Sequence, residues 1–414
     1  MTIRSAVVHL LPPGGGLRAL TELSLRSSDY LSYDLFTVDL GAFDSFPDLD
    51  TSRLEAGAGE VVREPLGGPV SRLGPRVLGP LRLPTLWHAV EDAERRLAAR
   101  IDAGGYDVVL VHNHRFWAAP SVLHHLRTPA LYYCQEPRRQ SYEFALDPLR
   151  RFDSTPPGPR RELALAAVTW AETRLRERDR RNARSSSRIM CNSRYSAEAV
   201  ARAYGRRGHI VPLGAELGAG GLPEGAPRGA HVVSVGAVTP AKGHDLVVEA
   251  IGCLPAERRP RLVIPHERSD PAYRSRLHSL AASRGVALDL REGVSDAALR
   301  DLYASAVATV CAAHLEPLGL SVAESLAAGT PVVAVAEGGF RETVEDGVNG
   351  LLVERDAAAL AGALERLMAG PPMFDPVELA RRAADRFDWS VGVDRYVANV
   401  AEVVGRVTTA KKTR

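Results

Sequence analysis

Short apolar runs alternate with amphipathic stretches of helical period along almost the whole of this sequence. Each apolar run has five to seven residues, which is the length of a buried strand. In the first half of the chain these runs are residues 6–11, 34–40, 107–112, 129–134 and 187–193. In the second half they are residues 231–236, 261–265, 286–290, 308–313 and 331–336. Strands that alternate with helices predict parallel sheets covered by helices, the α/β class.

A stretch rich in glycine and proline, residues 213–230, separates the two halves. Such a composition does not sustain a helix or a strand and is typical of a linker between domains. We therefore expect one αβ domain over residues 1–212 and a second over residues 231–384. The remaining residues, 385–414, have the period of a helix.

The charge balance limits the classes of partner. The 414 residues include 52 basic and 50 acidic side chains, a formal net charge of +2. This near-neutrality argues against binding to nucleic acid by overall charge. One arginine-rich stretch, residues 172–188, is compatible with an anionic membrane or a nucleic acid, but its interspersed acids favour a solvated helix. Peripheral contact with a membrane stays open.

Hydropathy and cysteine usage favour a cytoplasmic protein that needs no metal. Apolar runs such as 307–313 and 330–336 are far shorter than the roughly 20 residues that span a bilayer. The N-terminal run leads directly into Pro-Pro-Gly-Gly-Gly, which predicts a first strand rather than a signal peptide. The four cysteines lie at least 57 residues apart, so the chain has no Cys-x-x-Cys pair.

Residues 314–353 form the densest group of chemically informative side chains. A strand ending near Ala313 leads into a turn and then a helix, whose first amides would lie at the carboxyl edge of the sheet and bind phosphate. Glu316 precedes that helix and Glu324 lies one turn inside it, so two carboxylates that accept bonds from sugar hydroxyls would flank the phosphate. A nucleotide sugar has this shape. Each glutamate also has a purely structural alternative. Ser321 and Glu324 have the spacing of a capping box, so Glu324 could only cap its own helix, and Glu316 could be an exposed acid of the loop.

Two stretches resemble the donor-binding signature of glycosyltransferase family 4, retaining enzymes of the GT-B fold. One is EPLGLSVAE, in which seven residues separate two glutamates, and the other is GAVTPAKG, which contains one of only three lysines in the chain. The resemblance implies that Lys242 neutralises the donor diphosphate, Glu316 touches the transferred sugar and Glu324 holds the ribose hydroxyls. It also implies sugar or phosphate contacts for three main-chain amides, those of Leu318, Gly319 and Leu320.

The same resemblance implies two Rossmann-like domains that face each other across a cleft, with the C-terminal helix crossing back to the N-terminal domain. The implied reaction transfers a hexose-type sugar from a nucleotide diphosphate donor, with UDP favoured, to a hydroxyl acceptor with retention of configuration. No metal and no cofactor besides the nucleotide sugar is expected. The acceptor stays open among small metabolites, natural products and cell-envelope intermediates.

One position departs from the family pattern. The family usually has an arginine after the first glycine of the lysine motif, and this chain has Ala237. The diphosphate would then depend on Lys242, the helix start or an arginine from elsewhere, for which Arg291 and Arg341 are candidates. A non-catalytic GT-B-like binding subunit is therefore an alternative.

In the first half, the strand at DVVLVHNH ends with His112 and His114. Alternate residues of a strand share a face, so both rings are expected at the carboxyl edge facing the cleft. Taken alone, such a pair is more often part of a core or loop. The spacing of Asp107 and His112 resembles a D-x-x-x-x-H pattern of the family, which implies that His112 lies near the reacting sugar.

The loop at residues 12–20 offers glycines for a close backbone approach to a ligand. By resemblance to the paired-glycine loop of the family, Gly16 is expected at the donor and Gly15 at the acceptor, and the alternative is a tight turn without a ligand. Gly14, Gly16 and Ala19 also fit a weak G-x-G-x-x-A pattern. With Asp39 at a strand end, this pattern leaves an NAD-dependent oxidoreductase as a less favoured alternative.

Polar residues that follow the strand at 129–134 are candidate acceptor contacts: Gln135, Glu136 and Arg138. Together with Arg139 they could instead pair with one another at the surface. Asp48 and Asp50 spell D-x-D, which holds a metal in another class of sugar transferase. Three letters occur often by chance, so a solvated turn is expected there.

Overall fold

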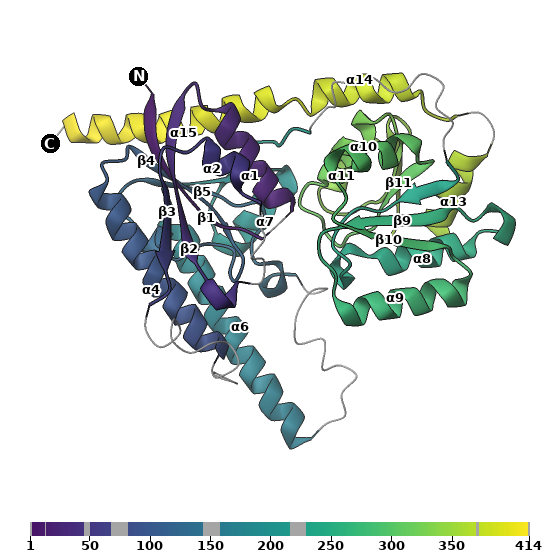
Figure 1. The fold of residues 1–414 in the computed structure, drawn as a ribbon, viewed down its shortest axis with the longest axis horizontal. Coiled ribbons are helices and arrows are strands. Elements are labelled where there is room, and N and C mark those ends of the chain that lie inside the picture. The colour runs from purple at the N-terminus through teal and green to yellow at the C-terminus, as the bar shows by residue number, and fades with distance from the viewer. Residues whose placement is uncertain are drawn as a thin grey trace. The chain divides into compact units, whose positions relative to one another are not determined.

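The computed structural model describes residues 2–12, 14–44, 50–67, 82–143, 158–215, 229–369 and 372–412. The chain forms two compact units (Figure 1). Unit 1 combines Met1–Pro212 with Val391–Arg414, and unit 2 is Leu213–Ser390. Most of the expected linker, residues 216–228, lies outside the described residues.

Unit 1 is built on a parallel sheet that has seven strands within the described residues, in the order β3-β2-β1-β4-β5-β6-β7. The strands are β1 Ile3–Leu10, β2 Leu31–Asp39, β3 Val61–Pro65, β4 Val108–His114, β5 Ala130–Tyr133, β6 Arg188–Cys191 and β7 Gly208–Ile210. The central strands are buried on both faces, which explains their continuous apolar runs.

Helices connect these strands and cover the sheet. They are α1 Gly15–Arg26, α2 Ser52–Ala56, α4 Arg82–Ala103, α5 Val122–His125, α6 Pro159–Ser185 and α7 Arg194–Tyr204, with short 3₁₀ turns at Gly41–Phe43 and Arg139–Ser141. A helix that leads into a parallel strand runs antiparallel to it. The N-terminal halves of α4 and α6 therefore lie toward the carboxyl ends of β4 and β6, and in Figure 1 both helices run along one side of the unit.

Unit 2 repeats this architecture with a parallel sheet that has six strands among the residues described, in the order β10-β9-β8-β11-β12-β13. Its strands are β8 His231–Val233, β9 Arg261–His266, β10 Leu288–Glu292, β11 Ala308–Cys311, β12 Val332–Val335 and β13 Gly350–Val353. Its helices are α8 His244–Cys253, α9 Pro271–Arg284, α10 Asp296–Ser305, α11 Leu320–Ala327, α12 Phe340–Thr343, α13 Ala357–Met368 and α14 Pro376–Arg386. Each unit has its own core of Val, Leu, Ile and Ala side chains.

The C-terminal helix α15, Trp389–Lys412, begins at the end of unit 2 and packs on unit 1. The Arg188 guanidinium, at the start of β6, donates to Asn399 Oδ1 at 2.8 Å and to Glu402 Oε2 at 2.7 Å. The Tyr396 ring meets Tyr133 edge-on. The helix therefore crosses back to the N-terminal domain, as the resemblance implies.

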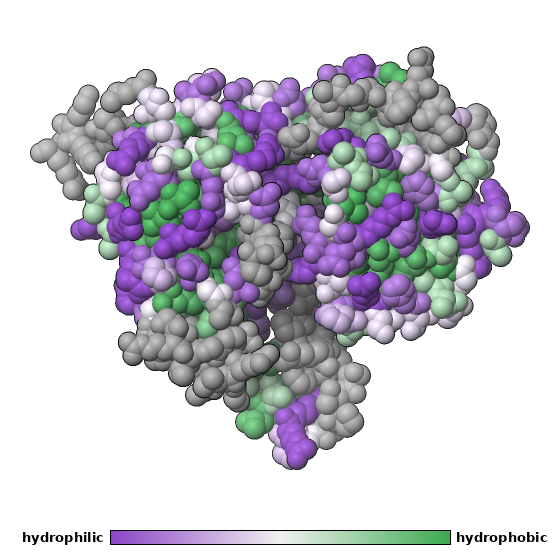
Figure 2. All heavy atoms as spheres, viewed as in Figure 1, coloured by the Kyte–Doolittle hydropathy of each residue, from purple (hydrophilic) through white to green (hydrophobic). Residues whose placement is uncertain are grey.

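Hydrophilic side chains are spread over the visible face of both units, with smaller apolar areas between them (Figure 2). None of the helices in the described ranges is both long and apolar enough to cross a membrane.

Candidate active site

The start of helix α11 is the predicted phosphate-binding segment of unit 2. Gly319 precedes the helix with φ +85°, a backbone conformation that residues other than glycine rarely adopt. A Cβ atom at this position would lie 2.7 Å from a ring carbon of Phe340. Glycine is therefore required to aim the first amides of α11, which have no partners within the helix, toward the carboxyl edge of the sheet.

The capping-box alternative for Glu324 is wrong because the helix begins two residues earlier than that box requires. The N-cap is Gly319, so Ser321 already lies inside the first turn. The half-buried Glu324 instead accepts a hydrogen bond from the hydroxyl of Tyr303, at 3.0 Å to Oε2. Its carboxylate is thus held by a tyrosine of α10 rather than by its own helix end.

Lys242 and Glu316 lie in contact. Lys242 ends a 3₁₀ turn, Pro240–Lys242, and its Nζ lies 2.8 Å from Glu316 Oε2. The two side chains keep 32% and 18% of their surface exposed, so solvent or a ligand reaches both. Lys242 and the first glutamate of the EPLGLSVAE stretch therefore form one ion pair beside the helix start.

The lysine turn is locked against the end of β11. Gly243 has φ +66°, and a Cβ there would lie 2.1 Å from the Ala312 carbonyl oxygen. The amide of His314 also donates to the Ala241 carbonyl at 2.9 Å. His244 is buried next to the turn, with Nδ1 3.0 Å from Ser234 Oγ, and burial lowers its pKa to about 4. It is neutral at pH 7 and acts as a support.

Sequence reasoning missed a second support, the ion pair of Arg355 with Glu337. Arg355 donates to the carbonyls of Ala312 and Ala313 at 2.9 and 2.8 Å, and its other contacts are with the Glu337 carboxylate at 2.7 Å. These bonds hold the pKa of Glu337 below its usual value. Leu315, next to Glu316, has φ +44°, so the loop that carries the glutamate is strained and needs such anchoring.

The two arginines considered as replacements at Ala237 differ in position. Arg291 lies on β10 and pairs with Asp289 at 2.8 Å. Because β10 is three strands away from β11, about 14 Å at the usual strand spacing, Arg291 does not lie at the helix start. Arg341 is exposed in α12, directly after the Phe340 that packs on Gly319.

The structure corrects the expected exposure of the two histidines. His112 is fully buried and its ring stacks on Tyr133, with 5.3 Å between ring centres. Burial, with a smaller contribution from His9, lowers its pKa to about 3. Buried His114 stacks on Trp117 at 4.4 Å instead. Both rings end the strand as predicted, but they lie in the interior of unit 1 because aromatic neighbours cover them.

Glycines of the first loop and the residues after β5 come together as the sequence suggested. Helix α1 starts at Gly15, and the Gln135 side-chain amide donates to the Gly16 carbonyl at 2.9 Å. A Cβ at Gly16 would lie 2.8 Å from Gln135 Oε1, so a larger residue there would displace the Gln135 side chain. Asn113 Oδ1 accepts from the Gln135 amide at 3.2 Å. Gly15, Gly16 and Gln135 are therefore one structural group.

The charged members of this segment are paired within unit 1. Arg138 forms an ion pair with Glu172 of α6, with 3.0 Å between Nη2 and Oε1. The half-exposed Glu136 lies 3.7 Å from Arg139. Pairing within the segment is thus observed for Glu136, whereas Arg138 pairs with a residue of α6 instead.

The features behind the oxidoreductase alternative have local structural roles. Asp39 Oδ1 accepts from the Gly41 amide at 2.9 Å and so caps the turn after β2.

The D-x-D motif is described in part. Asp50 accepts a hydrogen bond from the Ser52 amide at 3.0 Å at the start of α2, as expected of a turn, whereas Asp48 lies outside the described residues.

Comparison with known proteins agrees with the donor-site geometry. Residues 226–386, which include Lys242 and both glutamates, match the family described as glycosyl transferases group 1. This match covers most of unit 2 and less than half of the chain. D-inositol 3-phosphate glycosyltransferases from Xylanimonas cellulosilytica and Geodermatophilus obscurus are each 32% identical to this chain, over 255 and 247 residues. These alignments cover 56% and 51% of this chain and 59% and 52% of the relatives, so the chain spans little more than half the length of the curated relatives it matches.

Solved structures match this chain over almost its full length. HepE from Anabaena in complex with UDP and glucose has a TM-score of 0.62 at 18% identity and covers 97% of this chain and 100% of its own. Sucrose-phosphate synthase from Thermosynechococcus elongatus has a TM-score of 0.64 at 20% identity and covers 99% and 100%. These likenesses show the fold, which is GT-B with two Rossmann-like domains.

Proposed function

We propose that this protein is a retaining glycosyltransferase that transfers a hexose-type sugar from a nucleotide diphosphate donor to a hydroxyl acceptor without a metal. The contact of Lys242 Nζ with Glu316 Oε2 at 2.8 Å, beside the start of α11, carries the proposal. It unites a cation for the diphosphate, amides for its oxygens and a carboxylate for the sugar. UDP is the preferred nucleotide because HepE, a protein of the same fold, forms a complex with UDP.

The barrier to transfer is the charge separation between an oxocarbenium-like sugar and the departing diphosphate. Lys242 and the first amides of α11 stabilise the leaving group, because both are fixed before the reaction begins. Glu316 accepts hydrogen bonds from the transferred sugar and Glu324 from the ribose. The departing phosphate accepts the proton of the acceptor hydroxyl, so no side chain acts as a nucleophile.

Unit 1 supplies the remaining proposed contacts. His112 is a weaker candidate for a sugar contact, because its ring is fully buried and stacked on Tyr133, although burial keeps it neutral by lowering its pKa to about 3. Gly16 with Gln135 offers backbone and amide groups for hydroxyls. Glu136 and Arg138 are weaker acceptor candidates because each is already paired.

A second candidate, a non-catalytic nucleotide-binding subunit, is favoured by Ala237, which leaves Lys242 as the cation of its motif. Incubation of the purified chain with labelled UDP-sugars separates the two candidates. An enzyme transfers the sugar slowly even to water, and faster to an acceptor, and releases UDP each time. UDP that binds without any release of sugar, across a panel of nucleotide sugars, favours the binding subunit and contradicts the enzyme.

A further inference from the structure

Helices α4 and α6 border a cavity of about 400 Å³ on unit 1 that the proposed reaction does not use. Its apolar lining is Trp87, Trp170 and Leu175. Its polar lining is Arg174, Arg178 and Arg181, with His88 and one acid, Glu177. We call this cavity the α4–α6 groove. Its volume and its mixture of aromatic and charged side chains are those of a site for a small ligand.

The apolar side of the groove is fixed in part by the core. Leu175 is buried in the core of unit 1, and Trp87 packs against the same core. Trp170, in contrast, keeps 58% of its surface exposed. An exposed indole beside a preformed apolar wall indicates a surface that a ligand covers, because covering it removes a large apolar area from water.

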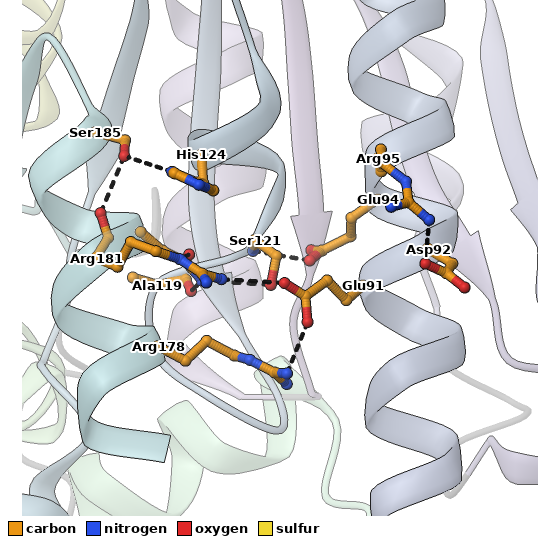
Figure 3. Close-up of polar contacts among 11 residues, drawn as sticks. Glu91, Asp92, Glu94, Arg95, Ala119, Ser121, His124, Arg178, Arg181 and Ser185 are labelled. Carbon is orange, nitrogen blue, oxygen red and sulfur yellow. Dashed lines mark hydrogen bonds and ion pairs between the residues drawn. The ribbon is translucent and has the colours of Figure 1, made fainter. Parts of the chain in front are cut away.

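The charges of the groove leave one arginine available. Figure 3 shows Arg178 and Arg181 of α6 reaching Glu91 of α4, at 2.6 and 3.0 Å. This bridge ties the two helices together through one nitrogen of each guanidinium group, whereas Arg178 Nη1 is buried without a hydrogen-bond partner in the described part of the chain. No acidic side chain of the described residues forms an ion pair with Arg174, whose guanidinium carbon lies 5.9 Å from the centre of the Trp170 ring. A positive charge thus lies next to the exposed aromatic wall.

The groove also lies toward the end of unit 1 where a sugar acceptor is expected. Trp87 and Trp170 belong to the N-terminal halves of α4 and α6, and both helices lead into parallel strands. Those halves therefore lie toward the carboxyl edge of the sheet, the edge at which β4 ends with His114 and at which ligands bind in such folds.

We propose that the α4–α6 groove binds the non-reacting end of the acceptor, and that this end is an amphiphilic anion. Its aryl or alkyl group would lie between Trp87 and Trp170, and its phosphate or carboxylate would bind the Arg174 guanidinium. The acceptor assignment rests on the proposed function, whereas the binding of an amphiphilic anion does not. A neutral apolar ligand would leave Arg174 without a partner, and an inorganic anion would leave the indoles exposed.

Titration calorimetry of the full chain with octyl phosphate, below its micelle concentration, tests the site. Trp170→Ala and Arg174→Gln are each expected to weaken octyl phosphate about tenfold, since each removes roughly 1.4 kcal/mol of binding. Leu163→Ala and Arg160→Gln are matched controls on the same helix, because both residues are exposed and neither lines the groove. These controls are expected to change the Kd less than twofold.

Three outcomes of these titrations overturn the site. The first is that the wild type and both groove variants bind octyl phosphate equally well. The others are that the wild type binds inorganic phosphate, or octyl glucoside, as tightly as octyl phosphate. Binding to phosphatidylglycerol vesicles that Leu163→Ala weakens as much as Trp170→Ala also overturns it, in favour of a membrane surface. UDP titrations test the donor site separately. The Kd of UDP is expected to be the same for the groove variants and the wild type.

The acceptor assignment is tested with hydroxyl-bearing alkyl phosphates as acceptors. Trp170→Ala and Arg174→Gln are expected to raise the acceptor KM about tenfold and to leave the donor KM unchanged. If a working donor is turned over to water but to none of these acceptors, the assignment is wrong even where octyl phosphate binds. If no donor is turned over at all, the proposed function fails instead.

Discussion

The Lys242 ammonium lies 2.8 Å from the Glu316 carboxylate although the two residues are 74 positions apart in the sequence. The contact depends on two loops at the carboxyl edge of one sheet, and on Gly243, which lets these loops touch. A donor diphosphate would compete with Glu316 for the same ammonium.

Lys242→Ala is expected to lower kcat for sugar transfer at least a hundredfold, the usual effect of removing one preorganised charge from a leaving group. Steady-state kinetics with saturating donor measure it. Arg258→Ala, an exposed cation of the same unit, is the control and is expected to leave kcat unchanged. Equal rates for wild type and Lys242→Ala exclude the lysine from the mechanism.

Glu324→Gln is expected to raise the donor KM roughly tenfold or more, because the ribose hydroxyls lose a charged acceptor. Since Glu324 caps no helix end, the melting temperature is expected to change little. Tyr303→Phe removes the 3.0 Å bond to Oε2 and is expected to have a smaller effect of the same kind. Lower thermal stability with an unchanged donor KM would assign Glu324 a purely structural role.

Arg355→Ala is expected to lower the free energy of unfolding by about 2 kcal/mol, since it leaves the Ala312 and Ala313 carbonyls and Glu337 without their partner. Urea denaturation measures the change. Because the loop that carries Glu316 is released, kcat is expected to fall as well. Arg381→Ala, which breaks an exposed ion pair with Glu378, is the control and is expected to cost less than about 1 kcal/mol. A destabilised variant with normal kcat would refute the link to Glu316.

Glu94 is expected to make the folded state less stable as the pH rises. Burial raises its pKa to about 8, against 4.5 for an exposed glutamate, so the folded state binds the extra proton between these values. The stabilising contribution is complete below pH 4.5 and is lost as the pH rises through 8. Glu94→Gln preserves the acceptor for the Ser121 amide, seen in Figure 3, and removes the titration.

Chemical denaturation at several pH values between 5 and 8 measures the Glu94 effect. The unfolding free energy of the wild type is expected to decline relative to that of Glu94→Gln as the pH rises. Parallel curves for the two proteins would mean that Glu94 does not retain its proton in the folded state.

Periodicity in the sequence was enough to predict the inner strands of both sheets and the edge strand β10, but not the other three edge strands. The short strands β3, β7 and β13 were not predicted. In β3 the apolar pair Val61–Val62 is followed by polar residues, and β7 has three residues that are only half-buried. Edge strands are covered on fewer sides, so selection for continuous apolar runs is weaker there.

The candidate donor residues Glu316 and Glu324 could be proposed from the sequence because their spacing within 314–353 is local. The role of Arg355 could not, since it acts through main-chain carbonyl groups that any residue carries, and no pattern marks its side-chain contact with Glu337. Burial of His112 also escaped prediction, because the covering Tyr133 comes from a neighbouring strand.

If the two units are expressed separately, the unit 1 protein has to include the C-terminal segment as well as residues 1–212. A fragment that stops at Pro212 would lack α15 and leave the nearly buried guanidinium of Arg188 without Asn399 and Glu402. Supplying residues 391–412 as a separate peptide, or grafting them after Pro212, would return those partners. The C-terminal segment is thus the part of the chain through which half-molecules could be reassembled and compared.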